Sequence, residues 1–343
     1  MEPGLIGGGP AKLIPTGAEP GSVKIGITGA AGFIGGALVP HLAARGHELV
    51  LVDNGTGPLR VEHSRWPVPK LDFASPDGLR LLSDCDVVLH LGAVSGVMAC
   101  AEDPVGSARV NVEGTRRLAD ACAAEETPLA FASSLAVVGA PESLPVTERT
   151  PPRPTHEYAR QKAAGEAIVA TSGAKGPAPT AVLRMSNVYG TYVVDGRTIA
   201  KGNVLNVFVR QAAEGVLRVN APGTQRRDFI HIDDVIAHWE RAVEYLAGRG
   251  HRPESVTFNV ASGESFSVLE VAGKVSRAWA STRPGEPSLE IRVVPNPREG
   301  IELVDPEFTV SRAWTEERLR LACSRHVDEV VDGLVRAATR RGG

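Results

Sequence analysis

Cysteine and long apolar runs are scarce in this 343-residue chain. Its four cysteines (Cys85, Cys100, Cys122 and Cys323) are scattered and form no CxxC pair, which argues against a disulfide framework or a zinc site and favours a reducing compartment. No apolar run approaches the roughly 20 residues that span a bilayer, so we expect no membrane segment. Residues 1–22 are rich in Gly and Pro and lack the basic start and apolar core of a signal peptide, so they predict a flexible tail. We therefore expect a soluble, cytoplasmic protein.

An excess of positive charge is also missing. The 37 Lys and Arg residues against 40 Asp and Glu give a net charge of −3. Proteins that hold a nucleic-acid backbone by charge normally carry a clear cation excess, so nucleic acid is not an expected partner. Hydrophobic residues make up 43% of the chain, which is enough to bury a large core and excludes the disordered classes.

The first half of the chain alternates short apolar runs with helical periodicity. Runs typical of strands are separated by helical stretches, which we place at 33–45, 107–124 and 155–170; the strand-like runs are 23–28, 49–52, 86–91, 128–132 and 180–183. The alternation predicts an α/β fold with a Rossmann-type, doubly wound parallel sheet. It breaks after Arg184, and a helix at 233–246 with a strand at 256–260 indicates a return to the sheet. We predict one domain from 23–184 plus about 231–260, and a smaller C-terminal lobe from about 185–230 plus 261–330.

A glycine-rich turn joins the first predicted strand to the first predicted helix. The segment TGAAGFIG, residues 28–35, has the spacing GxxGxxG, which allows a tight turn and close approach of the backbone to a pyrophosphate. The helix N-terminus then offers N–H groups to the phosphates. Asp53 ends the next strand, where a carboxylate accepts hydrogen bonds from the adenine-ribose hydroxyls and repels a 2′-phosphate. Each feature alone also fits a structural turn, but together they predict a dinucleotide site that prefers NAD to NADP.

A tyrosine and a lysine form a candidate catalytic pair. Tyr158 and Lys162 stand four residues apart in YARQK, on one face of a predicted helix. An ammonium beside a phenol lowers the phenol pKa from about 10, and such a tyrosine can take a proton from a sugar hydroxyl while hydride leaves the same carbon. Ser134 follows the predicted strand 128–132, where it could hydrogen-bond the reacting oxygen. The alternatives for the separate pieces are a solvated helix face and a strand-end cap.

In this order, the motifs resemble the extended short-chain dehydrogenase/reductase family, and within it the nucleotide-sugar epimerase/dehydratase group, over residues 23–319. The resemblance implies an NAD-binding domain, a substrate-binding lobe, and Ser134, Tyr158 and Lys162 as catalytic residues. The cofactor residues that it implies lie in TGAAGFIG, VDN, LDF, HLGA, VNVEGT and YARQK: Gly29, Gly32, Phe33, Ile34, Gly35, Asp53, Asn54, Asp72, Phe73, Leu91, Gly92, Ala93, Asn111, Tyr158 and Lys162.

The same resemblance implies a nucleoside diphosphate sugar as substrate and no metal. Asn187 stands in LRMSNVYG, Arg227 in QRRDFIH and Arg298 in REG, and together with Ser134 they are the predicted substrate-binding residues. Members of the family use the two arginines against the nucleotide diphosphate, and planar Arg donors suit bidentate phosphate contacts. For either arginine alone, a surface ion pair is the alternative.

Departures from the family pattern narrow the chemistry. Leu135-Ala136 stand where sugar 4,6-dehydratases carry Asp-Glu, and the Glu of the decarboxylating branch is missing from the same loop. The leading hypothesis is an NAD-dependent nucleotide-sugar epimerase that acts at C4 through a transient 4-keto sugar. The alternatives are a 4-ketoreductase or 4-dehydrogenase, and a catalytically silent dinucleotide-sensing protein. The family also implies a homodimer whose helices 107–124 and 155–170 pair, with small or apolar residues on the paired faces: Val110, Leu118, Ala121, Ala163, Ala167 and Ile168.

Overall fold

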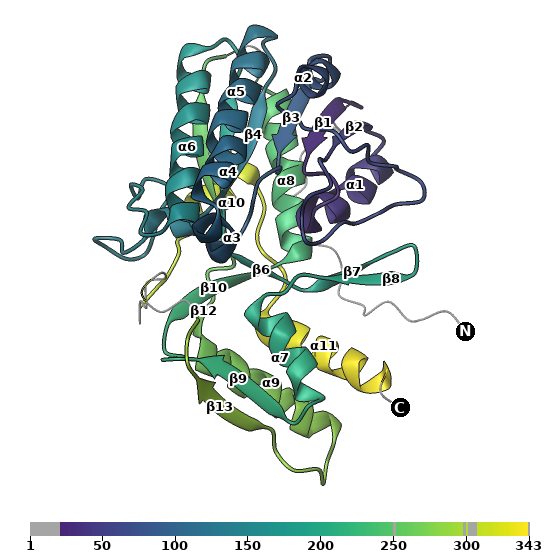
Figure 1. Cartoon of the computed structure of the whole chain (residues 1–343), viewed down its shortest axis with the longest axis vertical. Coiled ribbons are helices and arrows are strands. Elements are labelled where there is room, and N and C mark those ends of the chain that lie inside the picture. Colours follow the sequence, from purple (N-terminus) through teal and green to yellow (C-terminus); the bar gives the residue numbers. More distant parts are fainter. Residues whose placement is uncertain (1–20, 250–251, 298–299, 301–306, 342–343) are drawn as a thin grey trace.

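A six-stranded sheet forms the upper unit in Figure 1, in a computed structural model that describes residues 21–249, 252–297, 300 and 307–341. The strand order is β2-β1-β3-β4-β5-β11, and every neighbouring pair is parallel. The strands are β1 (Lys24–Thr28), β2 (Glu48–Val52), β3 (Val87–His90), β4 (Leu129–Ser134), β5 (Thr180–Met185) and β11 (Ser255–Val260). This arrangement confirms the predicted Rossmann-type α/β class.

Helices cover both faces of this sheet. On one face, α2 (Pro76–Leu82), α5 (Thr115–Ala124) and α6 (Glu157–Lys175) bury Leu82, Leu118 and Val169 against the strands. On the other face, α1 (Phe33–Ala44), α8 (Ile232–Ala247) and α10 (Ala313–Leu319) share a second core cluster with β1. The apolar runs that predicted buried strands are covered on both sides, as a parallel sheet requires.

The predicted helix 107–124 is interrupted. Pro104 begins α4 (Pro104–Ala108) after the cap Asp103, and α3 (Val97–Glu102) precedes it. A π-helical segment, η1 (Arg109–Gly114), then leads into α5. A π-helical turn holds one extra residue, so it changes which side chains face inward without ending the helix. Periodicity alone does not show such a turn.

A second unit lies at the carboxyl ends of the parallel strands (Figure 1). Its three-stranded sheet has the order β12-β10-β6, and a parallel pair β9–β13 lies beside it. The elements are β6 (Asn187–Tyr189), α7 (Val204–Ala212), β9 (Val216–Asn220), β10 (Arg226–His231), β12 (Ser265–Ser267), α9 (Val268–Thr282), β13 (Glu290–Val294) and α11 (Val327–Arg341). Strand β13 was not predicted, because most of its residues are exposed and show no alternation.

A β-hairpin extends from the second unit towards the first. It consists of β7 (Thr191–Val194) and β8 (Arg197–Ala200), joined by Asp195-Gly196 with φ values of 46° and 75°. Two residues with positive φ are the signature of a type I′ turn, for which Asp-Gly is a preferred sequence. The Asp-Gly pair between Tyr-Val-Val and Arg-Thr-Ile-Ala was therefore a usable signal for this hairpin, which was not predicted.

The limits predicted for the two domains stay a prediction, and the predicted tail lies almost wholly outside the described residues. Within the described part of the chain, no helix has the length and apolar character needed to cross a bilayer.

Candidate active site

The glycine turn lies where the strand order reverses, at the carboxyl ends of β1 and β3. This switch point is where open parallel sheets bind ligands. Gly29 has φ +68°, and a Cβ there would lie 2.7 Å from the Gly92 backbone nitrogen. A Cβ at Gly35 would lie 2.3 Å from the Gly29 carbonyl oxygen. Glycine is therefore required at both positions, and the close packing brings two of the predicted cofactor segments together.

The N-terminus of α1 is arranged to receive an anion. Its N-cap is Gly32, with no side-chain cap bond and no acidic residue in the first turn among the described residues. The N–H groups of this turn therefore have no side-chain acceptor at the N-cap, and a helix end of this kind suits the pyrophosphate of a dinucleotide. Asp53 follows β2 and accepts hydrogen bonds from Ala31 N (3.2 Å) and Gly55 N (2.7 Å). Its carboxylate thus borders the turn, as the predicted ribose contact requires.

A chain of hydrogen bonds runs through His90 beside the glycine turn, and each hydroxyl or ring in it donates to the next group. Gly92 N donates to Thr28 Oγ1 at 3.1 Å, and Thr28 Oγ1 lies 2.7 Å from His90 Nδ1. On the other side, His90 Nε2 lies 3.0 Å from Thr115 Oγ1, which itself donates to Asn111 O at 2.7 Å. Because Thr115 uses its proton on Asn111, the imidazole must carry its proton on Nε2. Burial, with a smaller contribution from Lys162, lowers the pKa of His90 to about 3, so the ring is neutral.

Asn111 binds the backbone directly after the HLGA segment. Its side chain accepts from Val94 N at 2.8 Å and donates to Val94 O at 2.9 Å. It also donates to Gln161 Oε1 at 2.7 Å, and Gln161 Nε2 donates to Ser107 Oγ at 2.8 Å. Gln161 is 3% exposed and directly precedes Lys162. No role was predicted for Gln161, although it stands inside the YARQK motif.

The other predicted cofactor residues surround the same turn. The ring of Phe73 lies 4.7 Å from that of His90, centroid to centroid, and Phe33 and Ile34 form the first turn of α1. Asp72 is exposed, and its side chain accepts from Ala74 N. Asn54 is exposed and accepts from Thr56, so its position is set by a local turn. Leu91 and Ala93 are half-buried on either side of Gly92.

The predicted catalytic residues converge where β4 ends and α6 begins. Lys162 is 5% exposed and its ammonium donates to Ala132 O at 2.7 Å. Burial raises the pKa of Tyr158 to about 12, while a hydrogen bond with Ser134 acts in the opposite direction. Burial lowers the pKa of Lys162 to about 8. The protein without cofactor therefore does not lower the pKa of Tyr158, although the Tyr-Lys spacing predicts that it should. Burial outweighs the hydrogen bond from Ser134, and the ammonium of Lys162 is directed to Ala132 O.

A buried ion pair fastens this part of α6 to the sheet. Glu166 accepts from Ser133 Oγ at 2.5 Å and from Arg184 Nη2 at 2.8 Å, and both members of the ion pair are less than 9% exposed. Glu166 lies one helical turn after Lys162, so the pair fixes the height of the Tyr158–Lys162 face against β4 and β5. The contacts among Ser133, Glu166 and Arg184 were not predicted, because the three residues lie on β4, α6 and β5.

The second unit brings together two of the predicted substrate residues. Strand β6 pairs in parallel with β10, so Asn187 lies opposite Phe229, and Asn187 Nδ2 donates to Asp228 O at 3.1 Å. Arg227 is the neighbour of Asp228, whose buried carboxylate accepts from Gly263 N at 2.7 Å. Burial raises the pKa of Asp228, and these donors oppose that shift. Arg298 lies outside the described residues.

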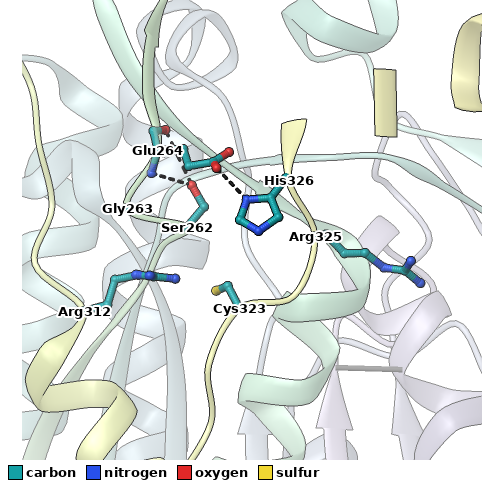
Figure 2. A pocket seen from close by; sticks show the side chains of 7 residues that line it. All are labelled: Ser262, Gly263, Glu264, Arg312, Cys323, Arg325 and His326. Carbon is teal, nitrogen blue, oxygen red and sulfur yellow. Dashed lines mark hydrogen bonds and ion pairs between the residues drawn. The ribbon is translucent and has the colours of Figure 1, made fainter. Parts of the chain in front are cut away.

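A cavity of about 130 Å³ lies elsewhere, between the segments 262–264 and 323–326. Figure 2 shows Arg312 pointing towards Cys323, His326 bonded to Glu264, and Arg325 directed away from the cavity. Each cation has a carboxylate partner: Arg312 with Glu316 (3.3 Å), Arg325 with Asp233 (2.8 Å) and His326 with Glu264 (2.6 Å). The cavity contains none of the predicted site residues, and its charges are compensated within the chain. Among the described residues there is no cluster of ligands suited to a metal ion.

Residues 25–261 match the model of the NAD dependent epimerase/dehydratase family. The chain belongs to this family. The matched range contains the glycine turn, the Ser-Tyr-Lys set and the β6–β10 pair, and it confirms the resemblance and the expected dependence on NAD.

Relatives and solved structures agree with this assignment. The chain is similar to a UDP-glucose 4-epimerase of Mycolicibacterium smegmatis, with 31% identity over 272 residues that cover 76% of this chain and 83% of that protein. A dTDP-L-rhamnose 4-epimerase of Burkholderia thailandensis is 28% identical over 310 residues, covering 76% and 82% of the two chains. The crystal structure of a Thermus thermophilus UDP-glucose 4-epimerase in complex with NAD superposes with a TM-score of 0.74 and 26% identity, covering 92% of this chain and 99% of the other.

Proposed function

We propose that this member of the family is an NAD-dependent nucleotide-sugar epimerase that acts at C4. One observation carries the proposal: Ser134, which hydrogen-bonds Tyr158, is also the N-cap of η2 (Leu135–Val138), a turn that has only apolar side chains. Leu135, Val137 and Val138 are buried, so no carboxylate of this turn could eliminate water or assist loss of CO₂. The Ser-Tyr-Lys set can move a proton to and from one hydroxyl, which is the proton transfer that a C4 epimerisation needs.

Bound NAD would accept a hydride from C4 and return it to the opposite face of the 4-keto sugar. The chain's own part is the movement of one proton and the stabilisation of one oxygen. Tyr158 would take the proton of the C4 hydroxyl as hydride leaves, and it would give that proton back when hydride returns. Ser134 would donate to the same oxygen while charge develops on it. With NAD bound, the positive charge of Lys162 would favour the ionised phenol only once its ammonium turns from Ala132 O, to which it donates in this structure, towards Tyr158.

The dinucleotide would rest on Gly29–Gly35, with its pyrophosphate against the N–H groups of α1 and its adenine ribose against Asp53. Asn111 and Lys162 would lie on the nicotinamide-ribose side. On the substrate side, Arg227 would bind the nucleotide diphosphate with Asn187 beside it. Two negative charges that leave water need fixed cations of matching geometry, and Arg supplies such a geometry.

The test is turnover without added cofactor. The purified protein should interconvert the two C4 epimers of one UDP-, dTDP- or GDP-sugar in a panel followed by NMR, with no net change in NADH absorbance. In a parallel reaction with added reduced cofactor, its stoichiometric, one-way consumption would instead identify the ketoreductase. Tyr158→Phe is the matched negative control, because it removes only the hydroxyl.

We further infer a homodimer that pairs α5 and α6 with their copies, and a reducing, cytoplasmic setting consistent with four free thiols. The structure changes which residues are available for the dimer face. Leu118 is 1% exposed and lies in the chain's own core, where Val110 and Ile168 pack against the same cluster. Ala163 packs against the cluster around Val137, whereas Ala167 is exposed and remains available. The sheet of the same chain therefore uses part of the predicted face, and the dimer proposal rests mainly on half-buried Ala121 and exposed Ala167.

A further inference from the structure

The β7–β8 hairpin contacts the unit opposite to the one from which it extends. Val194 and Ile199 are buried in the core cluster that also contains α1 and Val61. The ring of Tyr192 lies 5.3 Å from that of Phe33, centroid to centroid, and Tyr192 Oη donates to Phe33 O at 2.7 Å. The hairpin is thus held against the first turn of α1 by both apolar and polar contacts.

Two further hydrogen bonds connect the hairpin to the segment beside the glycine turn. Asp195 Oδ2 accepts from Ser64 N at 2.7 Å, and Arg197 Nη2 donates to Glu62 O at 3.1 Å. That segment is itself bonded to the turn, because Val61 N donates to Ala31 O at 2.7 Å. Hydrogen bonds from the hairpin therefore reach the glycine turn by two routes, one through Phe33 and one through residues 61–64.

The acceptor that Tyr192 binds is significant for the cofactor. The carbonyl of Phe33 and the N–H of Ile34 belong to the same peptide plane, so a hydrogen bond to the carbonyl fixes the direction of that N–H. It also polarises the peptide and strengthens the N–H as a donor. The N–H of Ile34 is in the first turn of α1, where the pyrophosphate is expected.

The root of the hairpin lies in the predicted substrate region. Only Gly190 separates β7 from β6, the strand that carries Asn187. Gly190 has φ +100°, and a Cβ there would lie 2.3 Å from His231 Nε2, so the chain passes directly against β10 at this point. The hairpin is therefore held at its root by the β6–β10 sheet and along its strands by α1.

We infer that Tyr192 is a positioning residue for the cofactor: the hairpin holds the first turn of α1 in the geometry that binds the pyrophosphate of NAD. The inference rests on the NAD site of the proposed function, and it is independent of which sugar is bound. Among the described residues, the hydrogen bond and the ring contact of Tyr192 are both with Phe33 and not with the proposed substrate residues or the Ser-Tyr-Lys set, so its effect is expected in cofactor binding.

The experiment measures dissociation constants by calorimetry and competition on cofactor-stripped protein that is reloaded with each probe. Tyr192→Phe removes one hydroxyl and keeps the ring. Loss of one neutral hydrogen bond should weaken NAD by about 2- to 10-fold. ADP-ribose, which carries the pyrophosphate, should weaken by the same factor, whereas adenosine, which lacks it, should bind as to the parent protein.

Two other variants make the test decisive. Asp195→Gly keeps the positive φ of the turn and removes the acceptor of Ser64 N, so it should also weaken NAD and ADP-ribose selectively. Tyr245→Phe is the matched control, because its hydroxyl donates to Glu254 Oε1 at 3.0 Å instead of to the turn. Unchanged NAD affinity in both hairpin variants would overturn the inference, and so would equal weakening of adenosine and ADP-ribose, which would indicate general loosening. None of these readouts depends on epimerase activity, so failure of the proposed sugar chemistry would be seen separately.

Discussion

Acidification should destabilise the protein through one buried histidine. His90 is 1% exposed and its two ring nitrogens contact Thr28 and Thr115 in a chain of hydrogen bonds that admits only the neutral ring. A second proton on the ring would have to point at Thr28 Oγ1, which already accepts from Gly92 N. Thr28 would then need a new acceptor for its own proton. Folding therefore opposes protonation of His90.

The magnitude follows from the difference between the folded and unfolded pKa values. Burial lowers the pKa of His90 from 6.5 to about 3. The neutral ring is favoured in the folded state, so this contribution is fully present above the unfolded pKa and is lost as the pH falls below it. At pH 5 the unfolded histidine is protonated and the folded one is not, which lowers the free energy of unfolding by about 2 kcal/mol relative to pH 8. The folded pKa hardly enters this value, because the folded ring is neutral at both pH values.

The assay compares urea unfolding of the parent protein and His90→Gln at pH 8 and pH 5, without cofactor. Gln has no proton to gain and keeps an N–H for Thr115. The variant should be less stable at pH 8, but on acidification it should lose about 2 kcal/mol less than the parent, at equal m-values. Other histidines, such as His238, titrate alike in both proteins and cancel. Equal losses in the two proteins would show that His90 is not held neutral, and would refute the proton assignment in the chain.

The remaining predictions address the site and the assembly. Tyr158→Phe should reduce turnover by at least about 100-fold with NAD still bound, measured by a coupled assay and by cofactor content; near-parent activity would reassign the proton carrier. The protein should bind NAD more tightly than NADP, and Asp53→Asn should weaken NAD by about 10-fold or more in calorimetry; tighter binding of NADP by the parent would contradict the role of Asp53. Arg227→Ala should lose about 2–5 kcal/mol of sugar-nucleotide binding with little change for NAD, and unchanged sugar-nucleotide affinity would place the diphosphate elsewhere. Light scattering should give the parent protein twice the mass of one chain, and it should give the Ala167→Glu variant the mass of a single chain. A monomeric parent would reject the dimer.

Local sequence determined the class of fold and the main parts of the candidate site. The glycine turn and the Tyr158–Lys162 pair were predictable because each depends on residues within one turn or one helix. The strands of the parallel sheet were predictable because burial on both faces demands continuous apolar runs. The hairpin had a local signal as well, in Asp195-Gly196, which shows that turn residues hold information beyond hydrophobic periodicity.

Tertiary structure alone decided how these parts are held and charged. Tyr192 and Phe33 are 159 residues apart in sequence. Neither residue type indicates that the Tyr192 hydroxyl binds the Phe33 carbonyl. The neutral state of His90 depends on hydroxyl groups from two other elements, β1 and α5. The high pKa of Tyr158 likewise depends on burial, which a motif does not encode. Hydrogen-bond direction and desolvation are set by the three-dimensional neighbours of a group, so they become definite only when distant segments of the chain are brought together.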